Sequence, residues 1–251
     1  MRKINKNITK LITMSILLAV PYSVQAAEYD DAILGSKDSY GSEIKTNVDN
    51  DYTYNFGEDS TVKVKGSNTG LGIEYNVNES DNNIVINPSH KLNIEISNDG
   101  NIDGNRRGIA ITMNDAQNKT IDRSGGGNIT VKTKDSQISY FTLLSGAAIE
   151  SGTDNTINLG DGNILVEGNN IKYGINASGI YVSGDSGNTI TMGNGTITVK
   201  ADAKADNMDN DYYSTALGVV VFGSNAAEIG NVDVSVEVIG NENIVETLAT
   251  G

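Results

Sequence analysis

The sequence predicts an all-β protein whose strands wind into a right-handed parallel β-helix of about six coils. Three observations support this prediction: Ile and Val alternate within short runs, Gly and Asn separate the runs, and a three-strand unit recurs along the chain. The 251 residues include 28 glycines and 2 prolines but no cysteine. Because disulfides are excluded, burial and backbone hydrogen bonds have to stabilise the fold.

The recurring unit is clearest from Ser178 to Ala201, which reads SGIYVSGDSG, NTITMGNG and TITVKA. Each segment holds two apolar residues at alternate positions, as one face of a β-strand requires. These pairs are Ile180 and Val182, Ile190 and Met192, and Ile197 and Val199. The upstream sequence GAAIESGTDNTINLGDGNILVEG repeats the pattern with Ala147 and Ile149, Ile157 and Leu159, and Ile164 and Val166.

Looser copies of the unit extend in both directions. We take five apolar residues as equivalent first-strand positions, at spacings of 36, 40, 31 and 39 residues: Ile73, Ile109, Ile149, Ile180 and Val219. Strands this short cannot bury an apolar face alone, so each unit has to stack on its neighbours. A parallel coil meets this need, because equivalent strands pair in register and alternate aliphatic side chains fill a continuous interior.

Asparagines mark one corner of the predicted coil. Asn82, Asn155 and Asn188 each lie two residues before an inward Ile of the second strand, and stacked Asn side chains can hydrogen-bond along the axis. An antiparallel sandwich or barrel is the alternative fold, since short strands at regular spacing suit it too. Repetition of a three-strand unit, instead of a two-strand hairpin, favours the coil.

The N-terminus is typical of a secretory signal peptide. An apolar run over 11–20 is preceded by four basic residues, Arg2, Lys3, Lys6 and Lys10. This run is too short for a membrane-spanning helix, which needs roughly 20 residues. We expect cleavage between Ala26 and Ala27, a linker or cap over 27–51, and repeats over 52–251. The mature chain keeps 14 basic and 32 acidic residues, and its net charge of −18 disfavours nucleic acid and anionic membrane surfaces as partners.

A signal peptide followed by Gly-, Asn- and Thr-rich repeats such as SGIYVSGDSGNTITMGNGTITV resembles the passenger region of bacterial autotransporters, which use type V secretion. The resemblance implies export, passage through a C-terminal outer-membrane barrel, and display at the cell surface or release outside. It further implies an adhesin that binds a protein or glycan of host, matrix or neighbouring cells. The repeats run to Gly251, so we expect the sequence to be truncated before that barrel, which would supply the membrane contact.

Two stretches invite a catalytic or metal interpretation. One stretch, Gly184-Asp185-Ser186-Gly187, resembles the nucleophile motif of chymotrypsin-like proteases. A serine nucleophile needs a histidine base, but the sequence around the sole histidine, His90, does not resemble the histidine motif of that family. The repeat explains the stretch as a turn equivalent to 151–154 of the preceding unit. The segment from Asp99 to Asp103 matches the opening of an EF-hand loop, yet Ala110 stands where the bidentate Glu belongs. We therefore predict a turn and a solvated acidic loop, with no metal or cofactor assigned and calcium binding at Asp99 to Asp103 left open.

An enzyme of another class, a β-helical polysaccharide lyase or glycosidase, is the alternative function. The absence of tryptophan and the scattered basic residues argue against it, so we expect a non-catalytic scaffold. The longest insertion, 201–215, carries Tyr212 and Tyr213, which form a candidate ligand-contact loop because exposed aromatic side chains anchor binding. Unpaired edges of the end coils also allow self-association.

Overall fold

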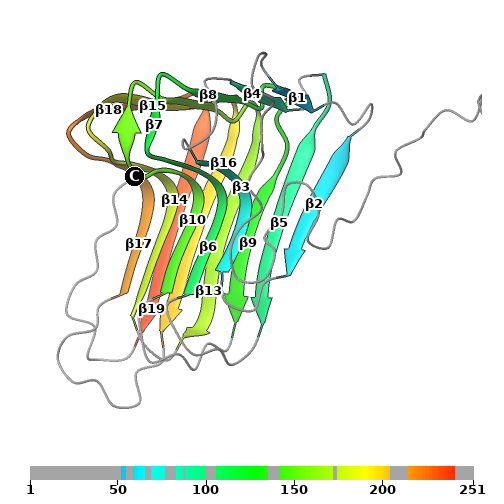
Figure 1. Cartoon of the computed structure of the whole chain (residues 1–251). Coiled ribbons are helices and arrows are strands. Elements are labelled where there is room, and N and C mark those ends of the chain that lie inside the picture. Colours follow the sequence, from blue (N-terminus) through cyan, green and yellow to red (C-terminus); the bar gives the residue numbers. More distant parts are fainter. Residues whose placement is uncertain are drawn as a thin grey trace, which may run out of the picture.

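The three-dimensional structure is a computed structural model, which describes residues 52–54, 59–65, 69–76, 83–86, 89–99, 106–134, 142–171, 174–203 and 214–240. The regular elements in these ranges are β-strands, and every pairing between them is parallel. The predicted parallel β-helix is confirmed, and the antiparallel alternative is wrong (Figure 1). No helix among the described residues is long and apolar enough to cross a membrane.

The strands form three sheets, which we call I, II and III. Sheet I contains β3 (Thr69–Asn76), β6 (Arg106–Asn114), β10 (Thr142–Ile149), β14 (Ile175–Val182) and β17 (Ser214–Val221). Sheet II contains β1 (Tyr52–Tyr54), β4 (Ile84–Ile86), β7 (Ala116–Gln117), β8 (Thr120–Asp122), β11 (Gly152–Thr153), β12 (Thr156–Asn158), β15 (Ser186–Met192) and β18 (Ser224–Ile229). Sheet III contains β2 (Ser60–Lys65), β5 (Leu92–Asp99), β9 (Ile129–Lys134), β13 (Gly162–Ile171), β16 (Gly195–Ala203) and β19 (Val232–Gly240).

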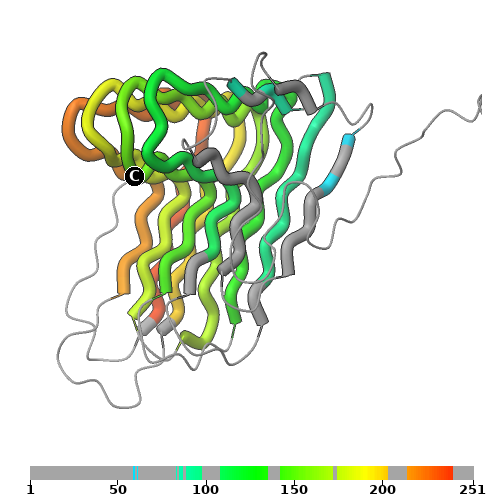
Figure 2. Tube along the Cα trace, in the orientation of Figure 1, coloured from blue at the N-terminus to red at the C-terminus, as the bar shows by residue number. Residues whose placement is uncertain are grey.

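From β3 onward each described coil passes through sheets I, II and III in that order, and sheet III takes one described strand from each of six successive coils. Figure 1 shows the strands of sheet I side by side along the solenoid, with sheet II at the upper edge of the view. The turns between sheets I and II stack on one another from coil to coil (Figure 2).

The predicted aliphatic columns fill the interior. Ile157 pairs with Ile190, and Ile164 pairs with Ile197; all four side chains are buried. Burying one such side chain is worth roughly 1.5–3 kcal/mol, so several per coil offset much of the conformational entropy that ordering a coil costs. The stack of apolar columns therefore holds successive coils together.

Two of the five positions taken as equivalent in the first strand are wrong. Ile73 pairs with Ile111 instead of Ile109. Ile111 in turn pairs with Ala147, and Ala147 with Ile180, so Ile149 lies two residues beyond the equivalent position. A local break in alternation accounts for Ile109, whereas Ile149 keeps the alternation and pairs with Val182, as the repeat itself indicates.

Sheet I bends in the middle of its strands, where two consecutive residues face inward. A Cβ on Gly146 would meet Ile164 Cγ2 at 2.4 Å, and the next residue, Ala147, is fully buried in the main core. Before and after this pair the outward positions are Ser145 and Ala148. Ile109, in register with Ser145, therefore faces outward and packs in a separate cluster with Ala148.

Candidate functional site

The bend in sheet I creates a groove on the outer face of the solenoid. The groove crosses β6, β10 and β14 and encloses about 130 Å³. Three side chains in register along its floor are Ile109, Ser145 and Ser178. They point away from the core yet are only 0%, 2% and 2% exposed, as a concave surface requires.

The serine hydroxyls of the floor use their hydrogens inside the protein. Ser178 Oγ donates to Ser145 Oγ at 3.1 Å, and Ser145 Oγ donates to the Ala147 carbonyl oxygen at 3.1 Å. At the end of the groove, Ser183 Oγ donates to the Glu150 carbonyl oxygen at 2.9 Å. A hydroxyl whose proton is engaged keeps lone pairs, and of these three serines Ser183 is the one that is more than slightly exposed.

The walls of the groove combine one amide with apolar surface. On one side, Asn176 Oδ1 accepts a hydrogen bond from Thr215 Oγ1 at 2.9 Å, which fixes the amide and leaves its Nδ2 group as a donor. On the other side, the Tyr181 ring meets Phe222 edge to face, with 5.8 Å between ring centroids. Phe222 directly follows β17 and is 54% exposed, so an aromatic rim extends from β14 to the last described coil.

A second, more open depression lies at the corner between sheets I and II. Asp115, Glu150 and Asp185 line it, and Ser151 Oγ donates to Asp115 Oδ1 at 2.8 Å. Glu150 lines both the corner and the groove. Among the described residues, no group of three or more His, Cys, Asp or Glu side chains is arranged to hold a metal ion.

The Gly184-Asp185-Ser186-Gly187 stretch forms the predicted turn. Gly184 adopts a φ of +100°, and the Asp185 amide donates to the Gly152 carbonyl oxygen at 3.0 Å. Ser186 pairs with Thr153 of the preceding coil, so this stretch occupies the same turn position in its coil as 151–154 does in the preceding one.

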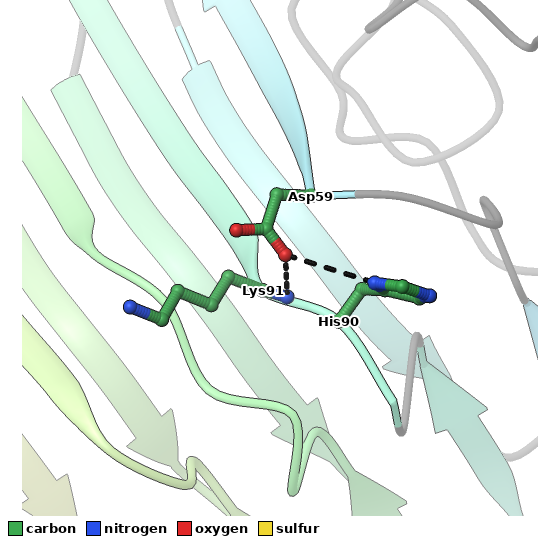
Figure 3. Close-up of polar contacts among 3 residues, drawn as sticks. All are labelled: Asp59, His90 and Lys91. Carbon is green, nitrogen blue, oxygen red and sulfur yellow. Dashed lines mark hydrogen bonds and ion pairs between the residues drawn. The ribbon is translucent and has the colours of Figure 1, made fainter.

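His90 lies far along the fold from Ser186, beside the first strand of sheet III. Its Nδ1 is 3.8 Å from Asp59 Oδ1, and the same oxygen accepts the Lys91 backbone amide at 2.8 Å (Figure 3). Both side chains are substantially exposed. Within the described part of the chain no serine hydroxyl bonds to the His90 ring, so the contact joins two coils at a corner and forms no nucleophile–base pair.

Other predicted site residues lie outside the described ranges: Ala26, Ala27, Tyr212 and Tyr213, and the segment 100–105. Asp99 ends β5 in register with Lys134. These cleavage, ligand-loop and calcium interpretations therefore stay predictions.

The groove itself was missed at the sequence level. Its signal is the recurrence of Ser-Gly at Ser145-Gly146 and Ser178-Gly179, where a small polar residue faces outward just before the bend. No protein-family model, curated protein or solved structure matches this chain.

Proposed function

We propose that this chain is the adhesin-like passenger of a bacterial autotransporter, a non-catalytic scaffold that binds cells or matrix through the outer face of sheet I. The observation that carries the proposal is the groove over β6, β10 and β14, whose lining combines serine hydroxyls, the Asn176 amide, the Tyr181 ring and aliphatic side chains. Small-molecule binding sites likewise combine apolar surface with placed polar groups, although their lining is usually more apolar than this one.

A long solenoid is suited to display. Each coil adds surface without needing a larger core, because every repeat contacts only its neighbours. The excess of acidic residues, 32 against 18 basic ones in the whole chain, favours solubility of such an extended surface. Tyr212 and Tyr213 remain a proposed second contact loop on the same scaffold.

The lyase or glycosidase alternative makes different demands on the groove. Glycoside hydrolysis ordinarily uses two carboxyl groups across the scissile bond. Among the described lining side chains of the groove, Glu150 supplies one carboxylate. Glu150 also lines the corner depression with Asp115 and Asp185, so an assay for hydrolysis products is needed to distinguish the two functions.

An adhesion assay tests the proposal. Beads coated with the purified exported chain should attach to cultured cells or matrix-coated surfaces. The double variant Asn176→Ala/Tyr181→Ala should lose most of this attachment, whereas Leu165→Ala/Thr198→Ala, on the outer face of sheet III, should retain it. Equal attachment by both variants would refute the assignment to sheet I. New reducing ends or unsaturated uronates released from polysaccharides by the wild-type chain would instead support the enzyme.

Export is tested separately. Expressed with its own N-terminus, the chain should leave the cytoplasm and begin at Ala27, as N-terminal sequencing or mass spectrometry would reveal. An uncleaved cytoplasmic product beginning at Met1 would contradict the export and surface-display part of the proposal.

A further inference from the structure

The two ends of the described solenoid carry complementary sheet edges. Among the described residues β2 and β19 are the terminal strands of sheet III, one in the first coil and one in the last (Figure 1). From the apolar surface, the register and the charges of these edges we infer that the last coil binds the first coil of a second copy of this chain, so that copies stack head to tail into longer rods. This interaction goes beyond the proposed adhesin function and does not depend on it.

The last described coil gathers exposed apolar side chains. The large hydrophobic side chains that are exposed among the described residues all belong to it: Val221, Phe222, Ile229 and Ile239. Val234 and Val236 of β19 are only partly buried, although their partners in the preceding coil, Ile197 and Val199, are fully buried. A concentration of exposed apolar surface is typical of an interaction site.

The backbone of β19 offers an edge for strand addition. β19 pairs with β16 on one side, and no described strand pairs with its other side. Among the described strands β2 likewise pairs with β5 alone. Every pairing in sheet III is parallel, so β2 of a second copy can continue this sheet beyond β19 with the same strand direction.

The register of sheet III defines which residues would meet in this contact. Followed from strand to strand, Val62 and Val64 of β2 occupy the same positions as Val234 and Val236 of β19. Stacked in this register, two copies extend the aliphatic columns of the interior from one molecule into the next. The contact between copies then repeats the contact between successive coils.

A polar column beside these valines ends in a hydrogen-bond acceptor. Asn128 Oδ1 accepts the Asn163 backbone amide at 3.1 Å, and Asn163 Oδ1 accepts the Thr196 backbone amide at 3.1 Å. Asp233 occupies the next position of this column, and Thr61 is the equivalent residue of β2. Asp233 is exposed, so its carboxylate can accept the Thr61 backbone amide of a second copy.

A charged column on the outer face of sheet III selects the register of the contact. Lys132 Nζ lies 3.2 Å from the Glu167 carboxylate. Lys200 Nζ lies 3.4 Å from the carboxylate of Glu237, whose side chain is 49% exposed. Lys65 is the residue of β2 in this column, so a second copy places a cation next to Glu237 and continues the alternation of charge. An exposed ion pair adds little affinity, but it discriminates between registers and partners.

The opposite orientation, with two last coils facing each other, is disfavoured. It would bring Asp233 and Glu237 of both copies to one seam, and like charges on paired strands repel. The head-to-tail contact instead joins two different surfaces and leaves one of each free at the ends of the pair. Such a contact propagates and does not close into a dimer.

Sedimentation velocity and light scattering of the purified exported chain at increasing concentration test the inference. The average mass should rise continuously, and electron microscopy should show rods of several molecular lengths. Lys65→Glu alone and Glu237→Lys alone should each need roughly tenfold more protein to associate, because each places like charges at the contact. Asp202→Lys changes the net charge as Glu237→Lys does, but in the preceding coil, and should associate like wild type. Circular dichroism checks that all variants fold.

An equimolar mixture of Lys65→Glu and Glu237→Lys separates the contact from any damage to the fold. In the mixture the last coil of each variant can meet an opposite charge on the first coil of the other. The mixture should therefore associate at wild-type concentrations although neither variant does so alone, and this recovery supports the inference. A wild-type chain that stays monomeric or stops at closed dimers overturns the inference. Association that neither substitution weakens, or a mixture of folded variants that does not associate, overturns it as well.

Discussion

The side-chain amide of Asn155 donates a hydrogen bond to Oδ1 of Asn188, 3.0 Å away on the next coil. The same amide donates to the Ala116 carbonyl oxygen at 2.8 Å, and Asn155 Oδ1 accepts the Lys119 backbone amide at 3.1 Å. Asn188 repeats the arrangement with Asn225 Oδ1, at 3.1 Å. Asn155 and Asn188 are fully buried, so this ladder satisfies corner backbone groups that water cannot reach.

Asn155→Ala should lower the free energy of unfolding by about 1–3 kcal/mol, because it leaves a buried donor and a buried acceptor without partners. Urea unfolding followed by circular dichroism measures this. Asn163→Ala is the matched control: Asn163 Oδ1 accepts the Thr196 amide at 3.1 Å, but its side chain is exposed and water can replace it. An equal loss in both variants would show that burial of the ladder does not matter.

Gly152→Ala should be far more damaging than Gly223→Ala. Both glycines have left-handed backbone, with φ of +99° and +66°, so alanine is strained at either position by about 1–2 kcal/mol. At Gly152 a Cβ would also lie 2.0 Å from the Ala116 carbonyl oxygen, whereas at Gly223 the nearest heavy atom is 3.9 Å away. To accommodate the new Cβ, the backbone at Gly152 would have to move away from the backbone at Ala116 in the preceding coil.

Thermal unfolding and limited proteolysis check the comparison. We expect Gly223→Ala to remain folded with a modestly lower Tm, and Gly152→Ala to lose at least twice as much stability or to be digested under native conditions. Similar stabilities of the two variants would contradict the close packing of corners that the register of β7 and β11 implies.

Glu167 makes the outer face of sheet III sensitive to acid. Its carboxylate is 3.2 Å from Lys132 Nζ and in register with Lys200 of the following coil. Burial raises the pKa of Glu167, but hydrogen bonds from Asn169 and Lys132 and the charges of Lys132 and Lys200 outweigh it, so the pKa lies below its ordinary value of 4.5. The folded state therefore binds this proton less readily than the unfolded state does.

The stability that Glu167 contributes is present above its ordinary pKa of 4.5 and is lost as pH falls through the lower pKa of the folded state. Glu167→Gln should flatten the decline of unfolding free energy with acid below pH 4.5, measured by urea titrations at a series of pH values. Glu228→Gln, an exposed carboxylate on β18 without a described cation contact, is the control and should follow the wild-type curve. If the unfolding free energy of Glu167→Gln fell with acid as steeply as that of the wild type, the interactions of Glu167 with Lys132 and Lys200 would not be the cause.

The fold was predictable because alternation and turn chemistry agree in the second and third strands of each unit. Ile157 and Ile190, for example, align both in the sequence and in the structure. The Asn corner was also predicted at Asn155 and Asn188, and the structure extends it to Asn225, while Asn82 lies outside the described residues.

The first strand was less predictable, because its bend breaks the two-residue period that pattern reading assumes. Ile109 looks like a core residue in the sequence, yet it forms the outward floor of the groove. Ser145 and Ser178 were not singled out in the sequence, and their burial on the outer face follows from the curvature of the sheet. The candidate site depends on tertiary shape that local alternation does not encode.

Arg123 is a second feature that the sequence pattern conceals. It takes an inward position equivalent to Ile86 and Leu159, and it is 1% exposed. Its guanidinium donates from Nη1 to the Leu159 carbonyl oxygen at 2.8 Å, and from Nε and Nη2 to the Leu92 carbonyl oxygen. Burial lowers the pKa of Arg123 to about 10, so the side chain still carries its charge at neutral pH.

Arg123→Met should lower the free energy of unfolding by roughly 1–3 kcal/mol, because methionine fills the space but leaves the Leu92 and Leu159 carbonyl oxygens without donors. Met192→Leu, an apolar exchange in a core position two coils further on, should cost less than about 1.5 kcal/mol and serves as the control. Urea unfolding at neutral pH measures both. If Arg123→Met were as stable as wild type or more so, burying the charge would cost at least as much as its hydrogen bonds contribute.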